Sequence, residues 1–103
     1  MTAPGDRLFA ILWRPGVSWK PDRPVTEQDL GRHRAYFADL SASGIVAAAG
    51  PFLDEEGGGL ALLKVKDMAE AIQVMQGDPA IEDQVFEGQV RPFYVVFPAR
   101  DDG

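Results

Sequence analysis

The chain has no cysteine and a single histidine, His33. The absence of cysteine excludes disulfides and thiolate chemistry. With one histidine, any metal site would have to be completed by carboxylates, which argues against a structural zinc site. The sequence therefore predicts a protein that binds no metal and needs no cofactor.

Positive charge and long apolar runs are also scarce. Ten Lys and Arg residues stand against 16 Asp and Glu, which gives a formal net charge of −6. Because binding to phosphates needs clustered positive charge, nucleic acid is not an expected partner. The apolar stretch 45–50 is far too short to span a bilayer, and residues 1–6 lack the basic start and apolar run of an export signal. We expect a cytoplasmic protein without membrane contact.

The length of 103 residues fits one domain with a real core and leaves no room for two. We expect a single domain over residues 1–103 with its core in about 8–97. The polar tail 100–103 is expected to be frayed.

The first half of the chain reads as strand, loop and helix. Residues 8–13, LFAILW, form a continuous apolar run that ends at Arg-Pro-Gly, as a buried strand would. The Pro- and Arg-containing stretch 14–25 reads as a loop. Thr26 is a candidate N-cap for a helix over 27–43, and Gly44 is its expected left-handed stop.

The second half reads as two strands, a helix and a last strand. The strands at 45–49 and 60–65 flank the segment 52–59, whose three consecutive glycines predict a hairpin loop. A capping-box-like start predicts a helix over 67–76. The last strand is expected at 90–97.

This order predicts an α+β fold of the ferredoxin-like split βαβ type (βαββαβ). In that motif, a four-stranded antiparallel sheet carries both helices on one face. The first strand is nevertheless apolar on both of its faces, which are formed by Phe9, Ile11 and Trp13 and by Leu8, Ala10 and Leu12. Because the helices cover one face, we expect the other to be buried against a second copy, in a homodimer with the character of an α/β barrel.

The helical spacing of Leu30, His33, Phe37 and Leu40 places the imidazole on the apolar, inward face of the first helix. An imidazole is the side chain that titrates nearest neutrality, so an inward histidine is a candidate proton carrier. The alternative is a core histidine with a structural hydrogen bond.

The two helices of this motif run in opposite directions, so the start of the first lies near the end of the second. Asp78, which directly follows the second helix, is therefore a candidate partner of His33. A bond to one ring nitrogen would fix the tautomer and leave the other nitrogen to take or give a proton. The alternative for Asp78 is a turn former before proline.

The same end of the domain should gather the residues that shape a pocket. We expect Trp13, the Gly50-Pro51 turn and Phe93 to line it, with core packing and turn formation as the alternatives. Arg14 or Arg91 is a candidate for receiving a carboxylate, the alternative being surface solvation.

The motifs that carry a family resemblance are RHRAYFADL (32–40), SGIVAAAGP (43–51), the Gly-rich hairpin, GDPA (77–80) and VRPF (90–93). In their order and spacing the chain resembles the YCII-related family of small, dimeric α/β-barrel proteins. This resemblance implies a histidine–aspartate dyad at His33 and Asp78. Ala80 and Gln84 depart from the family pattern, so the substrate cannot be carried over.

Three functions stay open at this point. The first is a small cofactor-independent isomerase or lyase, dehydrochlorinase-like, that moves protons on an organic acid, a lactone or a haloaromatic compound. The second is a noncatalytic ligand-binding or accessory module in which the dyad is structural. The third is a monooxygenase-like member of the wider dimeric barrel class.

Overall fold

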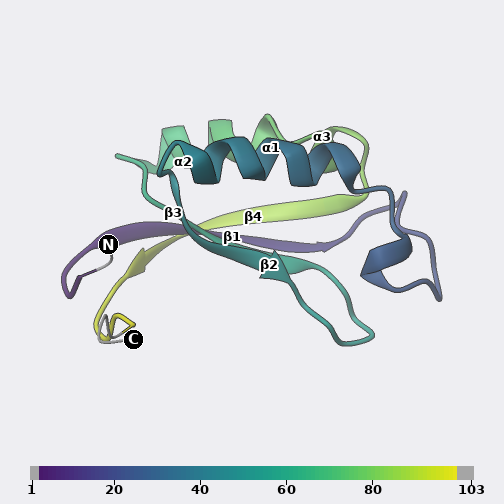
Figure 1. Cartoon of the computed structure of the whole chain (residues 1–103), viewed down its shortest axis with the longest axis horizontal. Coiled ribbons are helices and arrows are strands. Elements are labelled where there is room, and N and C mark those ends of the chain that lie inside the picture. Colours follow the sequence, from purple (N-terminus) through teal and green to yellow (C-terminus); the bar gives the residue numbers. More distant parts are fainter. Residues whose placement is uncertain (1–2, 100–103) are drawn as a thin grey trace.

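The computed structural model describes residues 3–99, which form one open four-stranded antiparallel sheet with three helices on one face (Figure 1). The helices and strands follow one another as β1 (Arg7–Pro15), the 3-10 turn η1 (Val25–Glu27), α1 (Gly31–Ala42), β2 (Val46–Pro51), β3 (Gly59–Leu63), α2 (Met68–Gln76), α3 (Pro79–Glu82) and β4 (Phe86–Tyr94).

The strand order in the sheet is β2-β3-β1-β4. Strand β1 pairs with β4 along its whole length, from Arg7 opposite Tyr94 to Pro15 opposite Phe86, and with β3 on its other side. Because β3 lies between β1 and β2, each βαβ unit is split by a strand of the other. The predicted α+β class and four-stranded antiparallel sheet are confirmed, whereas the barrel made by two chains stays a prediction.

Helix α1 begins at Gly31, four residues after the predicted start, and Thr26 is not its cap. The side chain of Gln28 explains the difference, since its amide oxygen accepts from the Lys20 N–H and its amide nitrogen donates to the Lys20 and Arg23 carbonyls. These bonds hold Gln28 in extended backbone, so η1 and α1 form separate elements. The predicted stop is correct: Gly44 has a φ of +81° in the left-handed region.

The end of the chain differs from the prediction in two places. The four-residue helix α3 was not expected, because it is too short to show a helical period. Strand β4 runs over Phe86–Tyr94 rather than 90–97, since Gly88 interrupts the apolar alternation at its start. A side chain at Gly88 would collide with Met75, as its Cβ would lie 2.7 Å from the Met75 sulfur. The predicted frayed tail, 100–103, lies outside the described residues.

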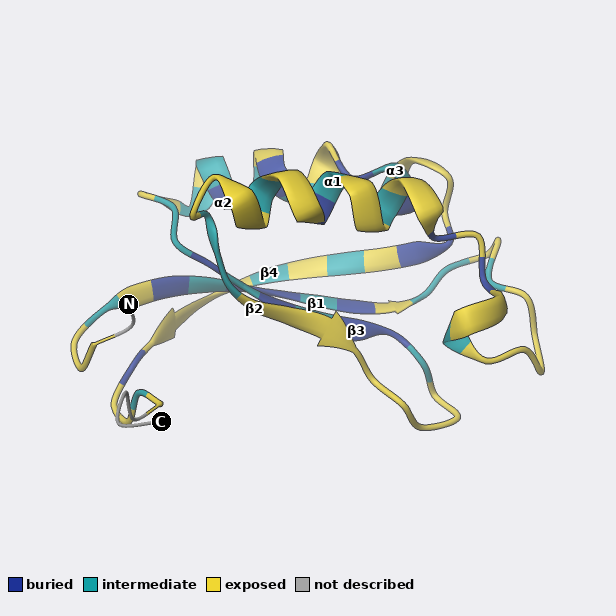
Figure 2. Ribbon diagram, viewed as in Figure 1, coloured by how far each residue is buried: buried dark blue, intermediate teal, exposed yellow. Residues whose placement is uncertain are grey.

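The core lies between the sheet and the helices (Figure 2). Ile11 of β1 and Leu63 of β3 are fully buried there. The face of the sheet away from the helices also carries apolar side chains. We call it the open face and define it by Leu8, Ala10, Leu12, Leu60, Leu62 and Phe93.

Within residues 3–99, no helix has the length and apolar character needed to cross a bilayer.

Candidate active site at His33

His33 is the third residue of α1, and its imidazole packs into a cluster of aromatic rings. Its ring centroid lies 5.0 Å from that of Trp13, 5.1 Å from that of Phe37 and 5.5 Å from that of Phe86. The Trp13 and Phe86 contacts are edge-to-face, a favourable geometry for aromatic pairs. The side chain is 14% exposed, so the ring is held in place but still reaches a surface.

Asp78 lies behind the imidazole, and its side chain is fully buried. Its Oδ2 lies 2.7 Å from His33 Nδ1, and its Oδ1 accepts a 2.9 Å hydrogen bond from the Ala80 backbone N–H as the N-cap of α3. An ionised carboxylate only accepts hydrogen bonds, so Nδ1 carries the proton. In the neutral ring Nε2 is then the unprotonated nitrogen.

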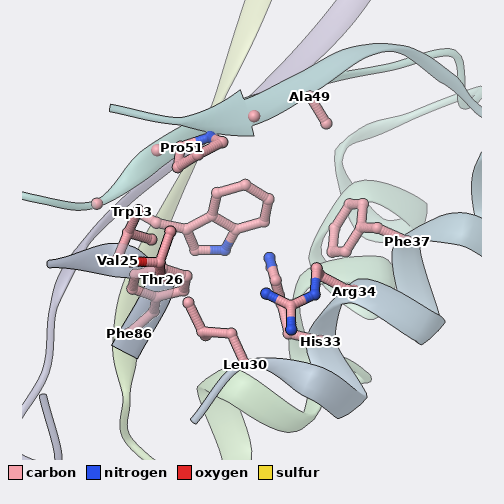
Figure 3. Close-up of a pocket in the computed structure, with 13 residues that line it drawn as sticks. Trp13, Val25, Thr26, Leu30, His33, Arg34, Phe37, Ala49, Pro51 and Phe86 are labelled. Carbon is pink, nitrogen blue, oxygen red and sulfur yellow. The ribbon is translucent and has the colours of Figure 1, made fainter. Parts of the chain in front are cut away.

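A cavity of about 320 Å³ opens in front of His33, between α1 and the sheet (Figure 3). It is lined by Trp13, Val25, Thr26, Leu30, His33, Arg34, Phe37, Ala49, Gly50, Pro51, Gly58, Gly59 and Phe86. Bulky rings from α1, β1 and β4 face small residues of β2 and β3, and this mismatch in size leaves the space. Since Asp78 does not line the cavity, the imidazole exposes its Nε2 side to a bound molecule.

The structure brings Trp13, Gly50 and Pro51 together with His33 in this lining. Phe93 does not belong to it, and that expectation is corrected here. Because β4 begins at Phe86, earlier than predicted, Phe93 lies near the far end of the strand, where it pairs with Leu8 on the open face. Phe86, which sequence reasoning missed, takes the place expected for Phe93, and Gly88 hid it by interrupting the apolar alternation between Phe86 and Val90.

Among protein families, the YCII-related domain matches residues 15–94. The chain belongs to the YCII-related domain family. The resemblance drawn from the motifs is thereby confirmed, and the matched range covers β1 from its last residue through to the end of β4. No curated protein matches the chain.

The two departures from the family pattern lie outside the lining of this YCII-related cavity. Ala80 is buried and donates its N–H to Asp78, and Gln84 has a φ of +61° in the connection before β4. Any influence of these positions on a ligand would therefore act through neighbouring residues.

Trp13 carries a buried donor at the edge of the site. The residue is 5% exposed, and its indole Nε1 has no hydrogen-bond partner among the described residues. An unsatisfied buried N–H costs about 1–3 kcal/mol, and such groups call for a reason in the local structure or function. The backbone of Trp13 lies close to Gly58, which has a left-handed φ of +84° and where a side chain would collide with the Trp13 carbonyl.

The arginine that lines the cavity is Arg34, not Arg14 or Arg91. Arg14 pairs with Glu87 at 2.9 Å, and Arg91 lies opposite Ala10 on the open side of the sheet. Sequence reasoning missed Arg34, although it follows Leu30 by four residues and precedes Phe37 by three. That spacing places it beside the apolar stripe that carries His33.

Tyr36 links α1 to α2 close to the dyad. Its hydroxyl donates a 2.8 Å hydrogen bond to the Val74 carbonyl. Burial raises the pKa of the Tyr36 phenol above its ordinary value of 10.0, and the negative charge of Asp78 raises this pKa further. The phenol is therefore neutral at physiological pH and serves as a donor.

Among residues 3–99, no group of three or more His, Cys, Asp or Glu side chains has an arrangement that could hold a metal ion.

Proposed function

We propose that this YCII-related domain is a small, cofactor-independent enzyme of proton transfer. It acts as an isomerase or a lyase, dehydrochlorinase-like, on an organic acid, a lactone or a haloaromatic compound. His33 is its general acid and base, and Asp78 orients the imidazole. The observation that carries the proposal is the 2.7 Å bond between His33 Nδ1 and a fully buried carboxylate, on a ring that faces a cavity.

The chemistry is a proton transfer between carbon and Nε2. His33 Nε2 takes a proton from a C–H group, and the electrons of that bond form a new C=C bond. In a lyase these electrons expel a leaving group such as chloride, and His33 then releases the proton to water. In an isomerase, an existing C=C bond of the substrate breaks as the new one forms, and its electrons take the proton back from His33 at a different carbon. In both, the carboxylate of Asp78 stabilises the imidazolium, and general acid–base catalysis of this kind contributes about 10²–10⁴-fold.

The cavity supports this proposal through its size and its lining. Its volume of about 320 Å³ lies at the lower end of the range of about 300–1,000 Å³ typical of small-molecule sites. Trp13, Phe37 and Phe86 give it apolar walls that keep water away from the reacting atoms.

Solvent-exchange NMR tests the proposal without a known substrate. Small organic acids, lactones and haloaromatic compounds are incubated with the protein in D₂O, and the loss of C–H signals or the appearance of products is followed. We expect His33→Gln to abolish the conversion and Asp78→Asn to slow it about 10²–10⁴-fold. Arg32→Gln is the matched control, because Arg32 precedes His33 on α1 but pairs with Asp83 at 3.3 Å. Conversion that survives His33→Gln in a folded variant would refute the assigned role.

A second candidate is a noncatalytic ligand-binding or accessory module. It is favoured by the scarcity of reactive groups in the lining, where the polar side chains besides Trp13 and His33 are Thr26 and Arg34. NMR titration of the lone imidazole discriminates between the two. In an enzyme the His33 signals respond both to Asp78→Asn and to added small acids, whereas in a module whose dyad is structural the signals ignore the ligands.

We also propose that the functional unit is a cytoplasmic homodimer that joins two open faces. No helix of residues 3–99 lies over this face. Leu12, Leu60 and Leu62 are half-buried there and Phe93 is 45% exposed, whereas Leu8 and Ala10 are already buried in the single chain. A second copy packed on the face by a two-fold axis would bury the same patch on both subunits.

A further inference from the structure

We propose that the cavity at His33 selects a small planar carboxylate and that Arg34 is the residue that binds its negative charge. This inference rests on the proposed function, since it names the substrate class of the same site. It favours an acid over a neutral lactone or haloaromatic compound.

Arg34 differs from the other arginines near this end of the domain in what surrounds it. Three neighbours are neutralised by carboxylates in the pairs Arg14–Glu87 at 2.9 Å, Arg23–Glu27 at 2.8 Å and Arg32–Asp83 at 3.3 Å. No carboxylate or hydrogen-bond acceptor of residues 3–99 contacts the Arg34 side chain in this way. Its guanidinium therefore keeps all its donors for a ligand.

The charge of the lining is unusual for so acidic a chain. The whole protein has 16 acidic residues and a net charge of −6, yet none of the thirteen described lining residues carries a carboxylate. Arg34 is the one permanent cation among them. Arg34 is exposed at the cavity, so its attraction for an anion is strengthened by the apolar walls where a ligand displaces water, and the cavity is suited to a negative ligand. A guanidinium matches a carboxylate with two parallel N–H donors.

The indole N–H of Trp13 has no partner among residues 3–99, but its nitrogen is buried, so the negative charge of a ligand is left to Arg34. Figure 3 shows the indole nitrogen on the edge of the ring that faces Leu30 and His33. The charged donors that a ligand can reach are therefore those of the exposed Arg34 guanidinium. A carboxylate, which only accepts hydrogen bonds, satisfies them.

The flat walls of the cavity favour a planar molecule behind the charged group. Trp13 and Phe86 lie nearly parallel, with centroids 5.8 Å apart, and Phe37 stands edge-on to Trp13 at 5.1 Å. His33 and Arg34 are consecutive on α1 and both line the cavity. A carboxylate bound by Arg34 would leave the rest of the molecule against the imidazole, where proton transfer takes place.

Calorimetry with benzoate and benzamide tests this proposal, because the two have nearly the same shape and differ in charge. We expect wild type to bind benzoate at least about tenfold more tightly than benzamide. Arg34→Gln should abolish this preference, Arg34→Lys should restore part of it, and the control Arg32→Gln should keep it. Equal binding of the two probes to wild type, or a preference that survives Arg34→Gln, would overturn the proposal.

Two further measurements separate this proposal from the proposed function. Benzoate binding by wild type should weaken with added salt while benzamide binding does not, a test that needs no variant. His33→Gln should still prefer benzoate although it cannot transfer protons. If wild type prefers benzoate but exchanges no protons, the anion site is supported and the proposed function is refuted. If wild type exchanges protons but binds benzoate and benzamide equally, the anion site is refuted and the proposed function stands.

Discussion

The two faces of the sheet are both apolar, yet one carries the candidate site and the other carries none. Alternate residues of β1 supply both faces: Ile11 and Trp13 point towards the helices, whereas Ala10 and Leu12 point away. What separates the faces is the layer above them. Helices α1 and α3 bring His33 and Asp78 over one face only. The position of the candidate site is therefore determined by the helices and not by the pattern of the strands.

The two sides of the sheet also differ in the burial of their polar side chains. On the helix side, a carboxylate is fully buried because both of its oxygens have partners. On the open side, Arg91 and Gln89 are exposed beside apolar residues. A buried polar group with defined partners therefore distinguishes the helix side of the sheet, which carries the candidate site, from the open face. The following predictions test this contrast.

The largest expected effect is on the free energy of unfolding when the helix-side core is truncated. Leu63→Ala should cost about 2–5 kcal/mol, since Leu63 is fully buried. Leu62→Ala, one position away on the open face, should cost clearly less at a protein concentration where the chain is monomeric, because Leu62 is only half-buried in the single chain. Urea unfolding of the two variants measures the difference. If both substitutions cost the same, the open face is as well covered as the core and the contrast fails.

The next effect concerns association through the open face. Leu62→Lys should raise the dissociation constant of the proposed homodimer at least about a hundredfold, because a buried charge in an apolar interface lacks a partner. Leu53→Lys is the control, as Leu53 is 88% exposed in the hairpin after β2. Light scattering at micromolar concentration gives the mass. A wild-type protein that is monomeric there contradicts the dimer.

A third effect concerns the buried carboxylate of Asp78 on the helix side of the sheet. Asp78→Asn should lower the free energy of unfolding by about 1.5–3 kcal/mol, the value of a hydrogen bond to a charged group. It should also shift the His33 proton away from Nδ1, which ¹⁵N NMR of the imidazole reports. The control Asp83→Asn breaks an exposed ion pair and should cost less than about 1 kcal/mol. An unchanged tautomer in Asp78→Asn would show that the carboxylate does not orient the ring.

The smallest effect is at Tyr36. Tyr36→Phe removes the bond to Val74 and should cost about 0.5–1.5 kcal/mol at neutral pH. The folded-state pKa of Tyr36 is raised, so its stabilisation is present below the unfolded pKa near 10 and is lost as pH rises through the folded pKa. The gap between wild type and variant should therefore narrow above pH ~10. Alkaline unfolding curves of wild type and Tyr36→Phe measure this gap, and a gap that stays constant above pH ~10 would contradict the prediction.

Much of the fold could be predicted because its signals are local. The apolar run at β1, the glycines of the hairpin and the cap at Asp67 each specify an element within a few residues. The start of α1 could not be read in this way, since the side chain of Gln28 ends η1 through contacts with residues up to eight positions away. The start of β4 was hidden by Gly88, whose small size is required by Met75 on another element.

The candidate site was predictable where topology alone brings residues together. Antiparallel helices place Asp78 near His33, and the structure has them 2.7 Å apart. The role of Phe93 was misjudged because β4 begins at Phe86 and not at residue 90. Phe93 therefore lies near the end of the strand, opposite Leu8, and not near its start beside the cavity. Arg34 was missed because the sequence does not show whether a carboxylate lies beside an exposed arginine in the folded protein.

The cap of α3 has a consequence for how the site is lost. One carboxylate holds both the first turn of this short helix and the imidazole, through Ala80 on one oxygen and His33 on the other. Local unfolding of α3 and release of the ring are then a single event. The exchange rate of the Ala80 amide with solvent would thus report how often the histidine is left without its orientation, long before the domain as a whole unfolds.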